Sequence, residues 1–182
     1  MGKLDVLLLN AGVMKLLGCA RTEAELHPGH ELQFATNHLG HYLLTMLLYP
    51  LLCESKFGRI VSVSSEAAVF YAKSGRTMRT DDPHWTKASE WDSMMAYGQS
   101  KMANAMFAKE LAERGKNKGI TAVSLHPGVV ATELSRHNVW WLSLIFACFR
   151  PLAFKTPMQG AQTSIYLCVC PELNNTEHKF NG

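Results

Sequence analysis

A tyrosine and a lysine four residues apart, Tyr97 and Lys101, are the residues with the clearest capacity for chemistry. They open a segment in which apolar residues recur at helical spacing, namely Met102, Ala103, Met106, Phe107 and Leu111. Positions four apart lie on one face of a helix, so both side chains would point the same way. An ammonium close to a phenol favours the phenolate and lowers the phenol pKa from about 10, which would let Tyr97 exchange a proton with a substrate oxygen near neutral pH. The alternative is a surface cation beside a half-buried ring.

Three short, mostly apolar runs predict the sheet that must position this pair. They cover residues 6–9, 59–63 and 120–125, and such runs are typical of parallel strands buried on both faces. A long helical pattern over residues 30–52 separates the first two runs, and the helix that contains Tyr97 precedes the third. The order strand, helix, strand, helix, strand predicts right-handed crossovers and a parallel sheet covered by helices.

Polar or turn residues follow each predicted strand. Asn10 starts the turn Asn10-Ala11-Gly12 after the first strand, Ser65 follows the second, and the turn Pro127-Gly128 follows the third. The carboxyl ends of parallel strands share one edge of a sheet, which is where open α/β sheets bind their ligands. Each feature alone could be only a turn or a helix cap. Their coincidence with the tyrosine–lysine pair indicates a ligand-binding edge.

The composition is that of an ordinary globular protein. The chain has 182 residues, of which 47% are hydrophobic and 18% charged, and this fits a single domain over residues 1–182. The net charge is +3 without a dense basic run, so we expect no nucleic-acid partner. Five cysteines without a C-x-x-C pair, and an N-terminus without a secretory signal, predict an intracellular, cytoplasmic chain with free thiols.

The ordered motifs resemble those of the short-chain dehydrogenases/reductases, in the branch of retinol dehydrogenases and WW-domain-containing oxidoreductases. The residues that carry the resemblance are Asn10-Ala11-Gly12, Asn37-His38-Leu39-Gly40-His41, Arg59-Ile60-Val61-Ser62-Val63-Ser64-Ser65, Tyr97-Gly98-Gln99-Ser100-Lys101 and His126-Pro127-Gly128. Residues 156–161 resemble a late helix start of the same branch. The resemblance extends over nearly the whole chain and implies an α/β fold with a Rossmann-like, doubly wound parallel sheet.

The resemblance also implies hydride transfer between a nicotinamide cofactor, NADP or NAD, and a small apolar alcohol or carbonyl compound of retinoid, steroid or lipid type. Tyr97 would be the general acid/base, Ser65, the second of two adjacent serines, would bind the same substrate oxygen, and Asn37 would hold a water linked to Lys101. The implied catalytic residues are Asn37, Ser65, Tyr97 and Lys101. The implied cofactor-binding residues are Asn10, Gly12, Tyr97, Lys101, Pro127, Val130 and Thr132.

The sequence departs from this family at its beginning. A complete member starts with a strand, a glycine-rich turn and a helix that binds the pyrophosphate, and no G-x-x-x-G-x-G occurs here. We therefore expect a sheet that starts at about the fourth strand, and the catalytic half of the domain with a weakened grip on dinucleotide. The alternative is a catalytically inactive truncated isoform or fragment that acts only through protein–protein binding.

Two further segments leave alternatives open. Residues 66–96 form a connection far longer than the usual ~4–6 residues. Within it, Trp85 and Trp91 would wall the substrate site or belong to a surface excursion. Residues 139–149 are strongly apolar but shorter than the ~20 residues of a membrane span. They predict a lid over an apolar substrate, a peripheral membrane contact, or a helix packed in the core or at the subunit contact of a homo-oligomer.

Pairs of histidines at a spacing of three raise the question of a metal site. His27 and His30 flank a Pro-Gly turn, and His38 and His41 lie in a motif that is already accounted for. These settings favour surface positions or helix packing, so we expect no metal.

Overall fold

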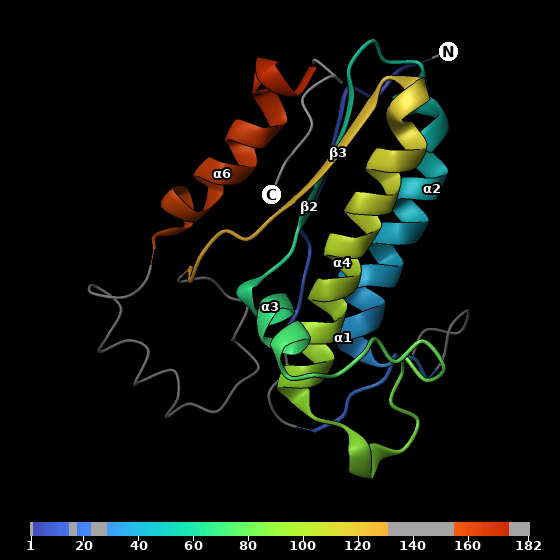
Figure 1. The fold of residues 1–182 in the computed structure, drawn as a ribbon, viewed down its shortest axis with the longest axis vertical. Coiled ribbons are helices and arrows are strands. Elements are labelled where there is room, and N and C mark those ends of the chain that lie inside the picture. The colour runs from blue at the N-terminus through green and yellow to red at the C-terminus, as the bar shows by residue number, and fades with distance from the viewer. Residues whose placement is uncertain (1, 15–17, 23–28, 131–154, 175–182) are drawn as a thin grey trace.

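The fold is built on a three-stranded parallel sheet (Figure 1). The computed structural model describes residues 2–14, 18–22, 29–130 and 155–174. Strand β2 (Gly58–Val63) lies between β1 (Val6–Leu9) and β3 (Ile120–Leu125), and both neighbours run parallel to it. The three predicted strands are confirmed, with β2 beginning at Gly58.

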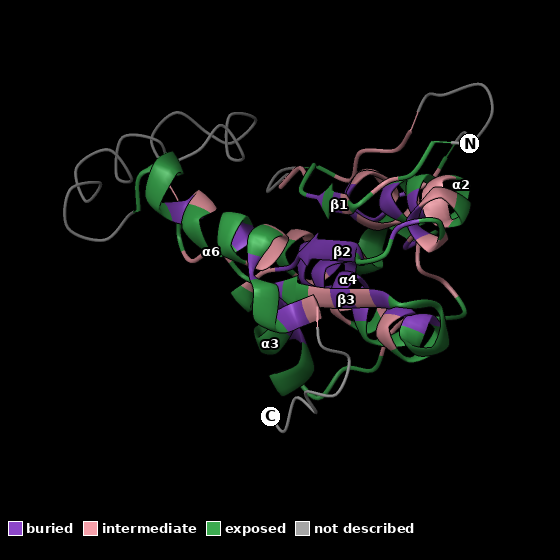
Figure 2. Ribbon diagram, turned by 90° about the horizontal axis from the view of Figure 1, so that it is seen from above, coloured by how far each residue is buried: buried purple, intermediate pink, exposed green. Residues whose placement is uncertain are grey.

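Helices cover both faces of this sheet. Figures 1 and 2 show α2 (Gly40–Cys53) and α4 (Ser93–Gly115) on one face and α6 (Pro157–Val169) on the other. Each of these helices contacts at least two strands. The predicted α/β fold with a doubly wound parallel sheet is confirmed by this arrangement.

The residues of β2 face the two helical layers alternately, and every one of them is buried (Figure 2). Ile60 belongs to the core on the side of α2 and α4, whose other buried members are Leu7, Leu9, Leu52, Leu111, Ile120 and Ala122. Val61 and Val63 point to the opposite side, where Leu125, Leu167 and Cys168 pack. Burial on both faces is the physical reason that the strand sequences read as apolar runs.

The long helix predicted over residues 30–52 is present, but it is not a single continuous α-helix. It begins as α1 (Leu32–Phe34), continues through a π-helical segment (Ala35–Leu39) and ends as α2. The Glu31 carboxylate caps the start by accepting a hydrogen bond of 2.6 Å from Phe34 N. A π-helical turn is a frequent feature of functional sites, and this one contains Asn37.

The connection at residues 66–96 contains regular structure. It opens with α3 (Glu66–Lys73) and includes a 3₁₀ turn (Ala88–Glu90) before α4 begins. Helix α3 packs closely on α4 because Gly98 has no side chain: a Cβ there would lie 2.8 Å from the Ala67 carbonyl oxygen. This close approach places the start of α3 beside the first turns of α4.

The remaining elements close the domain. A 3₁₀ turn (Lys116–Lys118) follows α4, and Gly119 adopts the left-handed conformation at φ 69° before β3. Helix α6 starts with a capping box between Thr156 and Gln159, so the predicted late helix start is confirmed. A last 3₁₀ turn (Pro171–Asn174) follows α6.

Candidate functional site

Residues from three separate elements meet at the carboxyl edge of the sheet. Gly12, in the turn after β1, lies close to side chains from both the π-helical segment and α4. A Cβ at Gly12 would lie 3.3 Å from Asn37 Oδ1, 3.5 Å from Lys101 Nζ and 3.9 Å from the Asn10 carbonyl oxygen. The π-helical segment and α4 thus bring an amide and an ammonium to a bare stretch of backbone, where a Cβ would press on the amide oxygen and touch the ammonium.

Lys101 lies on α4 and is buried. Its Nζ donates a hydrogen bond of 3.1 Å to the carbonyl of Val63, the last residue of β2. Burial disfavours the ammonium and lowers the pKa of Lys101 to about 8. The end of the central strand therefore holds a cation that is still mostly protonated at neutral pH.

Tyr97 lies one helical turn before Lys101 and is also buried. Burial raises the pKa of its phenol, and the Ser65 side chain acts in the opposite direction. The Lys101 ammonium lies 5.7 Å from the centre of the tyrosine ring and is directed to the Val63 carbonyl. The net pKa of the phenol is raised and not lowered as the sequence predicted, because desolvation is the largest effect. Tyr97 is held as a neutral phenol.

The two adjacent serines after β2 have different surroundings. The Ser64 hydroxyl is buried and donates a hydrogen bond of 2.6 Å to the backbone carbonyl of Lys101. The Ser65 hydroxyl accepts a hydrogen bond of 3.2 Å from Ala67 N, which caps α3, and it lies close enough to the Tyr97 phenol to lower its pKa. The structure therefore places Ser65, and not Ser64, against the phenol.

Asn37 is fully buried, and its amide is fixed from two sides. Its Oδ1 accepts a hydrogen bond of 2.8 Å from Val13 N, and its Nδ2 donates to Val13 O at 3.0 Å. The second Nδ2 proton goes to the Ser100 hydroxyl, also at 3.0 Å. Sequence reasoning did not single out Ser100. The available signal was a small polar residue three positions after Tyr97, on the turn that leads to Lys101.

The turn after β3 carries the remaining predicted cofactor residues. The Pro127 carbonyl accepts a hydrogen bond of 3.3 Å from Lys155 Nζ, and Val130 pairs with Lys155 in an isolated parallel bridge. These contacts tie the end of β3 to the start of α6. Thr132 and the apolar segment at residues 139–149 lie outside the described residues.

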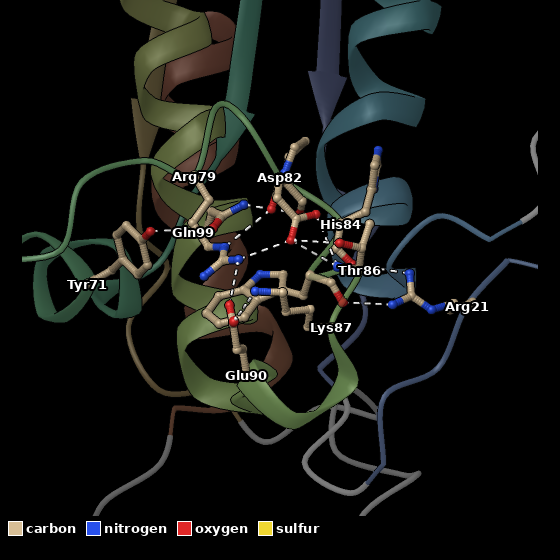
Figure 3. A network of polar contacts seen from close by, with 11 residues as sticks. Arg21, Tyr71, Arg79, Asp82, His84, Thr86, Lys87, Glu90 and Gln99 are labelled. Carbon is tan, nitrogen blue, oxygen red and sulfur yellow. Dashed lines mark hydrogen bonds and ion pairs between the residues drawn. The ribbon is translucent and has the colours of Figure 1, made fainter.

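A polar network holds the connection between β2 and α4 (Figure 3). Trp85 is buried with φ 52°, a left-handed conformation that is strained for such a residue, and the Arg79 guanidinium lies 4.5 Å from its ring centre. Arg21 donates a hydrogen bond of 2.7 Å to the Trp85 carbonyl, and Gln99 on α4 donates to the Pro83 carbonyl at 3.2 Å. The connection is thereby anchored to α4 and to the segment before α1.

A second anchor joins the segment around α1 to the beginning of α4. Trp91 Nε1 donates to the Glu31 carboxylate at 3.4 Å, and Gln33 Nε2 donates to the Ser93 carbonyl at 3.1 Å. Both Glu31 and Gln33 are fully buried. The predicted tryptophans, Trp85 and Trp91, therefore anchor the connection, and their role as a substrate wall stays a prediction.

Two of the histidines singled out in the sequence, His30 and His38, contact neighbouring side chains. His30 Nδ1 lies 2.9 Å from His84 Nε2, and His38 Nδ1 lies 3.1 Å from Asn104 Oδ1. In the part of the chain that the structure describes, no three His, Cys, Asp or Glu residues gather in a metal-binding arrangement. His27 lies outside that part. Over the same described ranges, every helix is too short or too polar to cross a membrane.

Comparison with protein families and curated proteins gives consistent matches. The model of a family described as short chain dehydrogenase matches residues 1–77 and 87–142. Retinol dehydrogenase 14 of Mus musculus is 38% identical over 182 residues, covering 99% of this chain and 51% of that protein. Retinol dehydrogenase 12 of Mus musculus is 40% identical over 178 residues, covering 98% and 52%. The chain spans about half the length of the curated relatives it matches.

Solved structures match as well. An uncharacterized protein from Mycobacterium paratuberculosis is 27% identical with a TM-score of 0.58, covering 99% of this chain and 69% of that chain. A short-chain dehydrogenase/reductase of unknown function from Caenorhabditis elegans, crystallised with cofactor, has a TM-score of 0.63 at 24% identity and covers 91% and 58%. These similarities confirm the Rossmann-like fold class that the sequence predicted.

Proposed function

The chain belongs to the short-chain dehydrogenase family, in the retinol dehydrogenase-like branch, and we propose that it is an oxidoreductase of apolar alcohols or carbonyl compounds with Tyr97 as general acid/base. The observation that carries the proposal is the position of the buried Lys101 ammonium, which lies 5.7 Å from the Tyr97 ring centre and donates to the last carbonyl of β2, with Ser65 close enough to lower the phenol pKa. This combination puts a proton donor, a second hydrogen-bond donor and a cation at the ligand-binding edge of the sheet.

The protonation state of Tyr97 suits carbonyl reduction. Because burial raises the pKa of the phenol, Tyr97 is protonated at neutral pH and can give its proton to a substrate oxygen. Ser65 would donate a hydrogen bond to the same oxygen, where negative charge develops as the carbon is reduced. Lys101 then stabilises the phenolate that the proton transfer leaves behind, since its ammonium lies 5.7 Å from the ring centre.

The bare backbone at Gly12 fits the proposed nicotinamide cofactor, because the ammonium of Lys101 borders the space that a side chain there would fill. Asn10, Gly12 and Lys101 would hold the ribose side of the cofactor, with Pro127, Val130 and Thr132 toward the nicotinamide. When bound, the nicotinamide supplies or accepts the hydride. NADP is the proposed form, and NAD is the alternative. One structural relative, a gluconate 5-dehydrogenase from Burkholderia cenocepacia, was solved with NADP.

The proposed substrate is a small apolar alcohol or carbonyl compound of retinoid, steroid or lipid type. The support is the naming of several curated relatives as retinol dehydrogenases, among them retinol dehydrogenase 11 and retinol dehydrogenase 13 of Homo sapiens. A peripheral membrane contact and a homo-oligomer built through residues 139–149 stay predictions, because that segment lies outside the described residues.

A second candidate is a non-catalytic protein that acts by binding partners. The observation that favours it is the outer edge of β1, which is unpaired among the described residues and presents Leu8, 42% exposed, to another chain. Calorimetric titration with NADP(H) and NAD(H) separates the two candidates. Micromolar affinity supports the oxidoreductase, and the absence of binding by a folded chain supports the second candidate.

The proposed chemistry is tested by the reduction of retinaldehyde with NADPH. The reaction is monitored through the loss of NADPH fluorescence. Tyr97→Phe should lower turnover by about 10²–10⁴-fold because it removes only the transferable proton. Tyr42→Phe is the matched control, since Tyr42 is exposed on α2 and loses an equivalent hydroxyl. If Tyr97→Phe retained turnover within a factor of a few, the proton donor would have to be another group.

A further inference from the structure

Among the described residues, the Asn37 amide hydrogen-bonds to the Val13 backbone and to the Ser100 hydroxyl. The Ser100 hydroxyl donates its own proton to the Tyr97 carbonyl at 2.7 Å. Toward Asn37 the Ser100 oxygen can therefore only accept, and it lies 3.0 Å from Nδ2. Ser100 thus reinforces the orientation that the Val13 backbone also sets, with the NH₂ end toward Ser100 and Oδ1 toward Val13 N at 2.8 Å.

This orientation determines which atom of Asn37 faces the site. Oδ1 borders the space beside Gly12 that the Lys101 ammonium also borders, at 3.3 and 3.5 Å from the position of a Cβ. Both protons of Nδ2 are already used, one by Val13 O and one by Ser100. The amide oxygen, with its partial negative charge, and the ammonium therefore border the same space beside Gly12.

We propose that Ser100 is a positioning residue of the site, whose hydroxyl orients the Asn37 amide and ties the Val13 backbone to the turn of α4 that carries Tyr97. This inference rests on the proposed function, because the turn of α4 matters only if Tyr97 is the general acid/base. Ser100 is fully buried and acts through Asn37, which is why its role is invisible in the sequence.

Loss of the hydroxyl leaves one Nδ2 proton of Asn37 without an acceptor in a fully buried position. The amide then keeps only its two hydrogen bonds to Val13, and the unpaired Nδ2 proton weakens the hold of Asn37 on Val13 N. Val13 belongs to no helix or strand, so the Asn37 oxygen is the acceptor that protects its N–H from hydrogen exchange. Movement of Oδ1 would take a partial negative charge from the space that the Lys101 ammonium borders, so we expect the Lys101 pKa, which burial lowers to about 8, to fall.

The experiment compares Ser100→Ala and Ser100→Cys with the control Thr45→Val in the full 182-residue chain. Cysteine keeps the volume of serine but is a weak acceptor. Thr45 is equally buried and donates to the carbonyl of His41 in its own helix at 2.7 Å, so its substitution removes a comparable hydroxyl away from Asn37. Hydrogen exchange at the Val13 amide is read by mass spectrometry with electron-transfer fragmentation.

Both Ser100 variants should speed exchange at Val13 by about tenfold or more, whereas Thr45→Val should not. A second readout is the pH dependence of Lys101 acylation by acetic anhydride, whose midpoint should fall in the Ser100 variants alone. Unchanged exchange at Val13 in a folded Ser100 variant would overturn the inference, and so would equal acceleration in Thr45→Val. Neither readout depends on turnover, so failure of the proposed function would leave this result standing.

Discussion

Lys101 and Val63 are joined by a hydrogen bond of 3.1 Å between a buried ammonium and the last carbonyl of the central strand. Among the described residues, no carboxylate forms an ion pair with this ammonium. A neutral carbonyl compensates only part of the loss of water. The folded protein therefore holds the proton of Lys101 less tightly than the unfolded chain does, and this makes stability depend on pH.

The free energy of unfolding should rise between pH 8 and about 10.5 through Lys101. Its pKa falls from 10.5 in the unfolded chain to about 8 in the folded state, so within this window the unfolded state binds more protons. The full effect is about 3 kcal/mol. Urea unfolding of the parent and of Lys101→Met across this range measures it. The free energy of unfolding of the parent, relative to that of Lys101→Met, should rise with pH across this window. A difference that stays constant with pH would contradict the assignment of the effect to Lys101.

Acid should destabilise the protein through His41. This side chain is buried, its ring nitrogens have no hydrogen-bond partner among the described residues, and burial lowers its pKa from 6.5 to about 4. The stability it contributes is complete above pH 6.5 and is lost as the pH falls toward 4, in total about 3 kcal/mol. His41→Leu should flatten this part of the pH profile in urea unfolding. The exposed His126 provides the control, His126→Leu, which should keep the acid sensitivity of the parent.

Arg59 should be a major source of stability for the packing of α6. Its buried guanidinium donates to the carbonyls of Leu167 and Cys170, at 2.8 and 2.9 Å, and to the Asn174 side chain. Arg59→Met leaves these acceptors unsatisfied and should lower the free energy of unfolding by roughly 2–4 kcal/mol. Arg114→Met, which removes an exposed arginine, should leave it nearly unchanged. Similar losses in both variants would mean that Arg59 acts only through its charge.

The outer edge of β1 should promote self-association. In the described residues β1 pairs only with β2, and Leu8 is 42% exposed. An unpaired edge with an apolar side chain and no blunting charge is a template for pairing with another chain. Size-exclusion chromatography with light scattering should show oligomers for the parent and a shift toward monomer for Leu8→Lys. A parent that is already a stable monomer would show that this edge is covered.

The order of strands and helices was readable in the sequence for a local reason. A parallel strand buried on both faces needs a continuous apolar run, and Ile60 and Val61 do face opposite cores. Helical spacing likewise placed Tyr97 and Lys101 on successive turns of one helix, now α4. These features depend on neighbours in the chain, so the sequence alone determined the fold class and the candidate pair.

The state of the candidate site was decided only by the tertiary structure. The pKa of Tyr97 is raised, and not lowered, because α4 is buried against other elements and the Lys101 ammonium turns to the Val63 carbonyl. Ser100 acquires its role from Asn37, which is 63 positions away in the chain. Desolvation and long-range hydrogen bonds depend on which surfaces meet, and residue spacing carries no record of that.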